Sequence, residues 1–116
     1  MKRIVPNEEL INLPCSVVAV SCALDSVPKD LPELKPDGYA TLKAANKFIR
    51  KHLDVQKYVS FKRFARPKLK DIVFESEAIV CILGHFIYVK QDIYYSFFDN
   101  DNDPIVAIWF LKGTHD

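Results

Sequence analysis

The chain has 116 residues, of which 49% are hydrophobic and 12% aromatic, and it contains only 3 glycines. This composition excludes a disordered segment and supplies one hydrophobic core, whereas the length is too short for two. The 16 Lys and Arg residues nearly balance the 15 Asp and Glu residues, which leaves a net charge of +1. We therefore expect a single domain over residues 1–116 and no nucleic-acid partner, because a basic excess is missing.

The cysteines indicate a reducing compartment. There are 3 of them, an odd number, and no two form a Cys-x-x-Cys pair, so neither a disulfide framework nor a zinc site is predicted. We expect a cytoplasmic protein with no metal and no cofactor. The apolar run over residues 78–83 is far shorter than the about 20 residues that a membrane span needs, so no membrane association is expected.

An apolar helix is predicted to begin close to Cys15 and to run to about Leu24. Pro14 suits the first helical position, because its missing N–H would have no partner there, and Asn12 or Leu13 would then be the capping residue. Apolar side chains occupy nearly every side of this segment, which is typical of a helix in the centre of a domain. We therefore expect this helix to be buried.

A second helix is predicted over residues 42–53, after a proline-rich surface loop over residues 26–38. Thr41 is a suitable N-cap, since its hydroxyl can accept a hydrogen bond from a backbone N–H in the first turn. One side of this helix is apolar and is expected to face inward, and the other carries several Lys and Arg residues. Such a run is typical of a solvated face, so we assign it no phosphate-binding role.

Short extended segments are predicted to follow the helices. They are rich in Val, Ile, Tyr and Phe, and turn-forming residues separate them. The Gln91-Asp92 pair between two of these segments predicts a β-hairpin. Helices first and an antiparallel sheet afterwards are typical of an α+β fold, with the buried N-terminal helix packed on a C-terminal sheet. The segments expected to be extended are residues 58–64, 69–74, 78–90, 93–98 and 105–111.

Cys15 is the candidate nucleophile. A thiol in the first turn of a helix lies close to unpaired backbone N–H groups and to the positive end of the helix dipole, and both stabilise the reactive thiolate. A buried core cysteine is the alternative for Cys15. Cys22 lies two turns further along the helix and Cys81 lies within a strand, so both are expected to be small core residues.

His85 is the candidate general base. It follows Gly84, whose missing side chain would allow another group to come close to the backbone next to the imidazole. A histidine that was simply part of the strand would need a hydrogen-bonding partner to offset its burial. His52 is expected on the polar side of the second helix and His115 in the C-terminal tail, so both are weaker candidates. A thiol on a helix and an imidazole on a later strand are what covalent catalysis by cysteine requires.

A third polar residue is expected to orient the imidazole from the strand paired with it. A three-residue hairpin turn would place His85 opposite Asp99. A two-residue turn would place it opposite Phe98, with Asp99 or Asn100 as the polar neighbours. We predict Asp99 for this role, with Asn100 second and Ser96 third. The alternative for Asp99 is a purely local role, because Asp and Asn often hydrogen-bond within their own loops.

These elements together resemble the small papain-like cysteine peptidases, in particular the bacteriocin-leader peptidases and short papain-like proteins of bacteriophages. The resemblance rests on Cys15 before a buried helix, on the strand Gly84-His85-Phe86-Ile87-Tyr88-Val89, and on Ser96-Phe97-Phe98-Asp99 in the next strand. It implies a papain-like fold in which Cys15 is the nucleophile, His85 the general base and Asp99 the orienting residue. It also implies hydrolysis of a peptide or amide bond through an acyl-enzyme, in a peptide or protein substrate.

The family usually places a glutamine about six residues before the nucleophile, where it donates a hydrogen bond to the oxyanion. That region of this chain offers Glu9, which cannot donate when it is ionised. Asn12 is nearer to Cys15 and carries an amide that can donate. Asn12 is therefore the candidate oxyanion donor.

Two other functions are compatible with the sequence. One is a catalytically inactive papain-like binding module, for example a small phage-encoded protein that binds a host factor, with exposed contact residues among Tyr94, Tyr95 and Phe97. The other is a structural protein that dimerises through an edge strand over residues 105–111, which contains Trp109. We therefore expect either a monomer or a weak homodimer.

Overall fold

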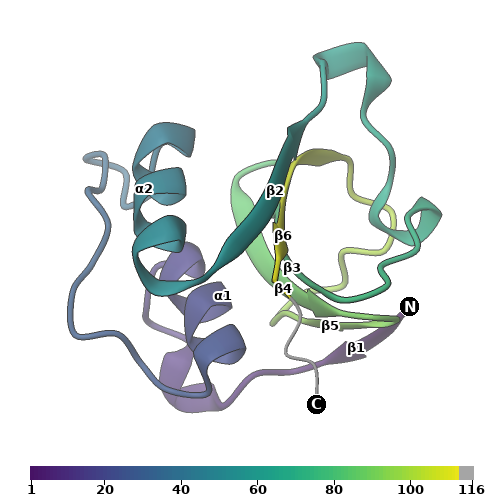
Figure 1. Cartoon of the computed structure of the whole chain (residues 1–116). Helices are drawn as coiled ribbons and strands as arrows, with labels where there is room; N and C mark the ends of the chain where they lie inside the picture. The colour runs from purple at the N-terminus through teal and green to yellow at the C-terminus, as the bar shows by residue number, and fades with distance from the viewer. Residues whose placement is uncertain (113–116) are drawn as a thin grey trace.

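The computed structural model describes residues 1–112 and places two helices on one face of a six-stranded sheet (Figure 1). The strand order across the sheet is β1-β5-β4-β3-β6-β2, in which β1 and β5 are parallel and all other neighbours are antiparallel. This architecture confirms the predicted α+β class. The elements are β1 (Lys2–Ile4), α1 (Cys15–Leu24), α2 (Leu42–His52), β2 (Val55–Ser60), β3 (Glu77–Ile82), β4 (His85–Lys90), β5 (Ile93–Tyr95) and β6 (Ile105–Leu111).

α1 is the buried helix that the sequence predicts, but it begins one residue later than expected. Pro14 has φ −54° and ψ 142°, so it is the N-cap, and Cys15 is the first helical residue. The backbone N–H groups of Val17 and Val18 both donate to the Pro14 carbonyl, at 2.9 and 3.0 Å. The N–H groups of Cys15 and Ser16 come before them and have no acceptor within the helix, so they are available at its N-terminal end.

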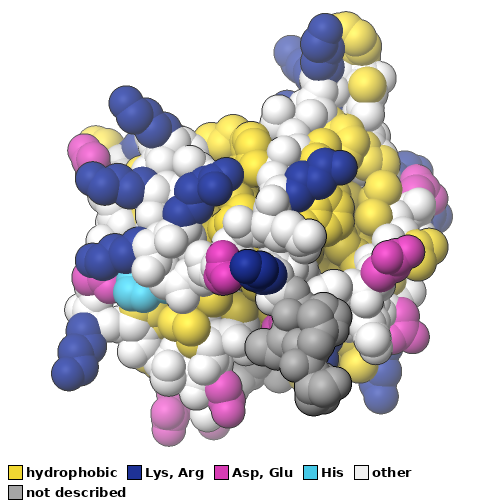
Figure 2. Space-filling view, viewed as in Figure 1, with side chains coloured by type: hydrophobic (Ala, Val, Ile, Leu, Met, Phe, Trp, Pro, Cys, Tyr) yellow, Lys and Arg dark blue, Asp and Glu magenta, His cyan; other side chains and the backbone are white. Residues whose placement is uncertain are grey.

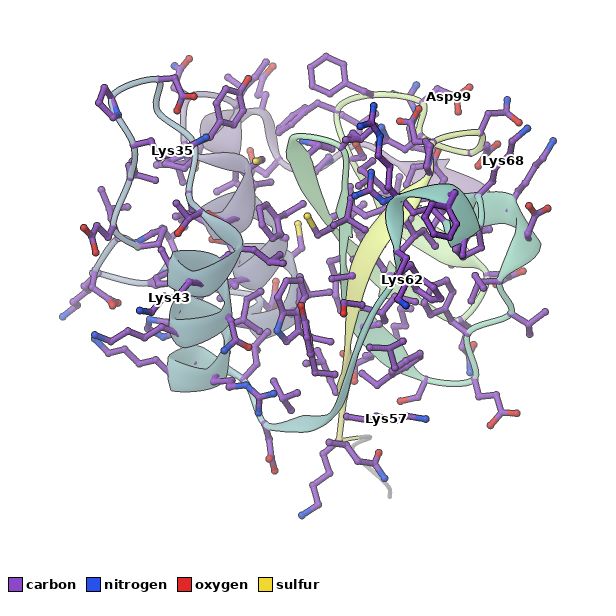
Figure 3. The ribbon with its side chains drawn as sticks, turned by 90° about the horizontal axis from the view of Figure 1, so that it is seen from above. Lys35, Lys43, Lys57, Lys62, Lys68 and Asp99 are labelled. Atoms are coloured by element: carbon purple, nitrogen blue, oxygen red, sulfur yellow. The ribbon has the colours of Figure 1, made fainter. Side chains whose placement is uncertain are left out.

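α2 is amphipathic, as predicted. The Thr41 hydroxyl caps it by accepting a hydrogen bond at 3.1 Å from the backbone N–H three residues later. Basic side chains cover its outer face (Figure 2), and Lys43 points away from the sheet (Figure 3). The helix ends at His52, so Leu53 is its C-cap and not its last helical residue. Neither helix of the described chain is long and apolar enough to cross a membrane.

Several predicted strands are wrong in extent or in kind. The strand predicted over residues 93–98 ends at Tyr95 as β5, so residues 96–98 are not part of it. β2 ends at Ser60, so only the first part of the strand predicted over residues 58–64 is extended. Residues 69–74 form no strand and begin with the 3-10 turn η3 (Leu69–Asp71). The first N–H of η3 donates to the Asp103 carbonyl at 3.1 Å, so this segment pairs with a loop instead of the sheet.

The extended run predicted over residues 78–90 is in fact two strands, β3 and β4. It breaks at Gly84, which has φ +69°, a conformation that glycine adopts without strain. His85 directly follows this turn and begins β4. The predicted hairpin at Gln91-Asp92 is confirmed, since β4 and β5 pair across these two residues.

β6 has the predicted bounds but lies inside the sheet, between β3 and β2. Dimerisation through this strand as a free edge was therefore a wrong prediction, because its backbone already pairs on both sides. Trp109 on β6 is fully buried, and its Nε1 donates to Asn46 Oδ1 on α2 at 2.9 Å. The rings of Tyr58 and Phe86 lie on either side, with centroids 5.1 and 5.9 Å from the Trp109 ring.

Apolar side chains cover both faces of the sheet. The two helices cover one face, and the connection between β2 and β3 covers the other, where it runs down the right of Figure 1. The site described below lies at the helix-covered face, where α1 crosses β4. The core on the helix side includes Val17, Val20, Phe48, Ile49, Ile79, Phe86 and Trp109, and the core on the other side includes Leu69, Phe74, Ile82, Ile87, Tyr94 and Ile105.

We expect Trp109→Ala to lower the free energy of unfolding by about 3–5 kcal/mol, because it removes a large buried ring and leaves a cavity. Urea unfolding followed by circular dichroism measures this change. Phe64→Ala is the matched control, since Phe64 is 92% exposed and its removal should change the value by less than about 0.5 kcal/mol. Equal losses in the two variants would contradict the place of Trp109 in the core.

Candidate active site

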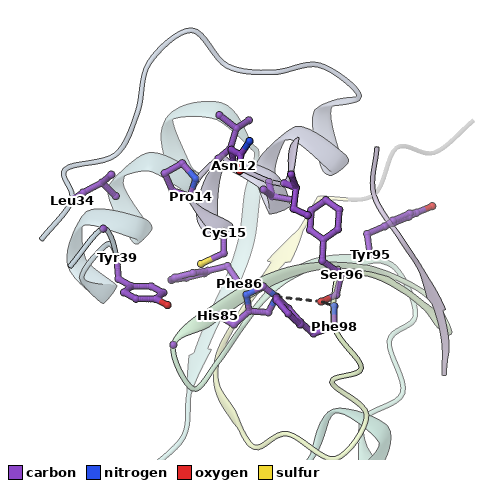
Figure 4. A pocket seen from close by; sticks show the side chains of 16 residues that line it. Asn12, Pro14, Cys15, Leu34, Tyr39, His85, Phe86, Tyr95, Ser96 and Phe98 are labelled. Carbon is purple, nitrogen blue, oxygen red and sulfur yellow. Dashed lines mark hydrogen bonds between the residues drawn. The ribbon is translucent and has the colours of Figure 1, made fainter. Parts of the chain in front are cut away.

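A cavity of about 570 Å³ lies where the start of α1, the loop before α2 and the end of the sheet meet (Figure 4). Cys15 lines it from α1 and His85 lines it from β4, so the predicted nucleophile and base share one cavity. Ser96 lines it from the segment that follows β5, and Asn12 from the segment that precedes α1. Most of the remaining lining is apolar.

The Cys15 thiol lies against the backbone of β4. The N–H of Phe86 and the N–H of Ser16 both act on the sulfur and favour its anion, as expected where a helix start faces a strand. Burial acts in the opposite direction and is the larger effect, so the pKa of the Cys15 thiol is raised above its ordinary value of 9.0. The thiol is therefore protonated at neutral pH and needs a base to become a nucleophile.

His85 follows Gly84 on the strand that the thiol faces, and its ring is held on one side. In Figure 4 the Cys15 sulfur points toward the part of β4 that carries His85 and Phe86. Among the described residues, no hydrogen bond joins the thiol to the imidazole; the bond made by the ring runs from Nε2 to Ser96 Oγ, at 3.2 Å. The Phe98 ring packs edge-on against the imidazole, with centroids 5.7 Å apart.

A chain of hydrogen bonds continues from Ser96 and ends on a carboxylate. The Ser96 hydroxyl donates to Asn100 Oδ1 at 2.5 Å, and Asn100 Nδ2 donates to Asp103 Oδ2 at 2.7 Å. Asn100 and Ser96 are both buried, so neither can exchange these partners for water. We call the series His85–Ser96–Asn100–Asp103 the relay.

The direction of each hydrogen bond in the relay follows from which groups can donate a proton and which can only accept one. The Asp103 carboxylate only accepts, so Asn100 must turn its amino group to it and its oxygen to Ser96. That oxygen also only accepts, so Ser96 uses its one proton there. Ser96 Oγ must then accept from His85, which places the imidazole proton on Nε2. The lone pair of Nδ1 is left as the base.

The imidazole is neutral at physiological pH. Burial lowers the pKa of His85 from its ordinary value of 6.5, and the negative charge of Asp103 opposes this effect only in part. A neutral ring can accept a proton, which a charged ring cannot. The protonated thiol and the neutral imidazole are thus a complementary acid and base in one cavity.

Asp99 does not lie where a residue that orients the His85 imidazole would have to be. Its carboxylate accepts from the Tyr94 hydroxyl and from the Asp101 N–H, both at 3.2 Å, and it is exposed on the loop after β5 (Figure 3). The Tyr94 hydroxyl in turn accepts from the Asn100 N–H at 3.0 Å. Asp99 therefore supports the loop that carries Asn100, and no hydrogen bond within residues 1–112 links it to His85.

The two-residue turn explains this outcome. Its register, continued beyond the last pair of Tyr88 with Tyr95, would place His85 opposite Phe98. The pairing ends at Tyr95, so the chain has already left β4 when it reaches Asp99. Ser96 and Asn100, the third and second choices for the orienting residue, are the ones in the relay. Asp103 was not predicted; the only signal in the sequence was its spacing of three from Asn100 within an Asp- and Asn-rich loop.

The position of Ser96 depends on β1. The Ser96 N–H donates to the Ile4 carbonyl at 3.1 Å, and Arg3 Nη1 donates to the Phe97 carbonyl at 3.1 Å. β1 also pairs with β5 just before this point. The first strand of the chain thus holds the segment from which Ser96 reaches the imidazole.

The remaining predicted residues lie as follows. Asn12 is exposed and lines the cavity, whereas Glu9 lines a separate depression next to Cys22. His52 pairs with Asp30 at 2.7 Å, away from the cavity. His115 lies outside the described residues.

The other two thiols are poorly suited to react. Burial raises the pKa of Cys22 to about 11 and that of Cys81 to about 12. Tyr94, one of the residues predicted as an exposed contact, is only 1% exposed, so that prediction was wrong for Tyr94. Tyr95 and Phe97 are partly buried and line the cavity.

The chain matches no protein-family model, and no curated protein or solved structure is significantly similar to it. Within residues 1–112, no three His, Cys, Asp or Glu side chains come together in a way that could hold a metal ion.

We expect nitrogen chemical shifts of His85 near neutral pH to report a neutral ring with its proton on Nε2, because the relay accepts a proton only at that atom. Ser96→Ala should remove this preference. Asp99→Asn is the control and should preserve it, since an amide oxygen can still accept from Tyr94. A proton found on Nδ1 in the unmodified chain would refute the deduced bond directions.

The lowered pKa of His85 also predicts how stability depends on pH. The unfolded chain binds a proton at His85 near pH 6.5, whereas the folded chain binds it only at lower pH. The contribution of the neutral His85 ring to the free energy of unfolding is thus fully present above pH 6.5. It is lost as pH falls from 6.5 through the pKa of His85 in the folded chain. In urea unfolding, the difference between the unmodified chain and His85→Gln should shrink over this interval. A difference that stays constant with pH would contradict the burial of the ring.

Proposed function

We propose that this protein is a papain-like thiol hydrolase, which cleaves a peptide or amide bond through an acyl-enzyme on Cys15. The observation that carries the proposal is the relay, which occupies His85 Nε2 and leaves Nδ1 free, in a ring that lines the same cavity as the Cys15 thiol. A core histidine would need one hydrogen bond to offset its burial. The series of three hydrogen bonds with a fixed direction goes beyond that need and orients the ring, as a general base requires.

The order of the elements supports the papain-like type. A helix that begins with Cys15 packs against an antiparallel part of the sheet, and His85 opens the strand that this helix crosses. An amide side chain, Asn100, stands behind the histidine through Ser96. In the proposed enzyme, Ser96 and Asn100 are positioning residues, because they act through the imidazole and do not touch the reacting atoms.

The acylation step follows from these positions. His85 Nδ1 accepts the Cys15 proton while Sγ forms a bond to the carbonyl carbon of the substrate. The carbonyl oxygen becomes an oxyanion, for which the backbone N–H at the start of α1 and the Asn12 amide are the available donors. The C–N bond then breaks, and the imidazolium gives its proton to the departing amine.

The deacylation step reverses the roles. His85 Nδ1 accepts a proton from water, and the water oxygen bonds to the carbonyl carbon of the thioester. The C–S bond breaks, a carboxylic acid leaves, and the sulfur regains the proton from the imidazolium. The sum of the two steps is hydrolysis of one amide bond, with the enzyme unchanged.

A peptide electrophile tests the proposal without knowledge of the natural substrate. We expect a peptidyl vinyl sulfone to add once, at Cys15, as measured by intact mass and by digestion. His85→Gln should slow this addition about 10²–10⁴-fold, because the thiol then lacks its base. Cys22→Ala is the matched control and should leave the rate unchanged, whereas Cys15→Ala should abolish the adduct.

Equal and slow modification of all three cysteines would refute the hydrolase. That result would favour an inactive papain-like binding module, whose contact surface would be the aromatic rim of the cavity. Tyr39 and Phe98 on this rim are 51% and 63% exposed, and exposed aromatic side chains are frequent anchors of protein interfaces. In that case Cys15→Ala would retain the full biological effect.

A further inference from the structure

A second basin, of about 330 Å³, adjoins the active-site cavity. Tyr39, Gly84 and Phe86 line both, so the two hollows meet at the turn between β3 and β4. The charged residues of the second basin are Arg66 and Lys35, and no acidic side chain lines it. A substrate that passes the thiol would thus meet a positive region on this side.

Arg66 lacks a partner within the described chain. Its Nε is buried and makes no hydrogen bond, and no carboxylate of residues 1–112 forms an ion pair with its guanidinium. A buried donor on a charged group is costly to leave unpaired, and such a group in a native protein calls for an acceptor. Lys35 differs, since its Nζ lies 3.4 Å from Asp37 and is about half exposed.

The backbone holds Arg66 in place. Arg66 precedes Pro67, and its φ of −79° and ψ of 120° are the extended values that a following proline favours. The Pro67 carbonyl accepts from the Ile105 N–H at 2.7 Å, which ties this point of the β2–β3 connection to the start of β6. The guanidinium is therefore presented by a fixed segment and not by a free loop.

We infer that the Arg66 basin is a subsite for a carboxylate of the peptide substrate, either an Asp or Glu side chain or a free C-terminus. The inference rests on the proposed function, because it names the class of peptide that the Cys15 site would cleave. Arg66 offers the planar pair of donors that matches a carboxylate. The apolar side chains of Leu83 and Val106 also line the basin.

Binding to the full chain with Cys15→Ala tests the subsite apart from catalysis. Three peptides serve as probes: acetyl-Ala-Phe-Ala-Glu-Ala-amide, the same peptide with Gln in place of Glu, and acetyl-Ala-Phe-Ala with a free C-terminus. The readout is the nitrogen-proton signal of Arg66 Nε during titration. We expect saturable shifts with a carboxylate peptide and an apparent affinity about tenfold above that of the Gln peptide. A shift with the Glu peptide alone would indicate an acidic side chain as the ligand, and a shift with the free acid alone would indicate a C-terminus.

Two variants complete the experiment. Arg66→Gln should abolish the preference for the carboxylate peptides, and Lys43→Gln, which removes an exposed charge on α2, should preserve it. Equal affinities for the Glu and Gln peptides, or no shift of the Arg66 signal with any probe, would overturn the inference. Should Arg66→Gln fail to fold, the titration of the Cys15→Ala chain alone still decides between these outcomes.

The failure of this inference can be distinguished from failure of the proposed function. Vinyl sulfone addition at Cys15 together with equal binding of the Glu and Gln peptides would remove the subsite and leave the hydrolase. A selective shift of Arg66 in a protein that neither reacts at Cys15 nor cleaves peptides would remove the hydrolase and leave a carboxylate-binding site.

Discussion

The packing of α1 across β4 is the constraint on which the rest of the structure depends. α1 is apolar on nearly every side, so it can be stable only between the sheet and α2. In this place its first turn faces the backbone that links His85 to Phe86. The same contact that buries the helix therefore places the Cys15 thiol in the cavity that His85 also lines. Phe86 belongs to both the core and the lining of the cavity, so the two share residues at this crossing.

Burial gives the cavity a resting state without charge. It favours the protonated form of the Cys15 thiol and the neutral form of the His85 imidazole. A thiolate and imidazolium pair would form only when a substrate is attacked, and the N–H groups at the helix start would then stabilise the negative charge. The one full negative charge of the relay is on Asp103, and Ser96 and Asn100 separate it from the His85 ring. It can therefore fix the orientation of the imidazole without making it permanently charged.

Local signals explain what could be predicted from the sequence. Thr41 before an amphipathic run predicts α2, and the short turn at Gln91-Asp92 predicts a hairpin; both depend on neighbouring residues. The break at Gly84 was harder to predict, because β3 and β4 are buried on both faces and show no alternation. The orienting residue depends on where a loop folds back after β5, which no local pattern specifies. For this reason Asp99 was favoured, although Ser96 holds the ring.

The parallel pairing of β1 with β5 determines when the cavity is completed during folding. Arg3 and Phe97, which this pairing brings together, are 94 positions apart in the chain. Contacts between such distant residues carry the greatest entropic cost of closure and tend to form late in folding. The support behind the His85 ring would then be completed only after β1 docks on β5. A chain in which β1 has not yet docked would lack the backbone contacts that hold the Ser96 segment behind the imidazole.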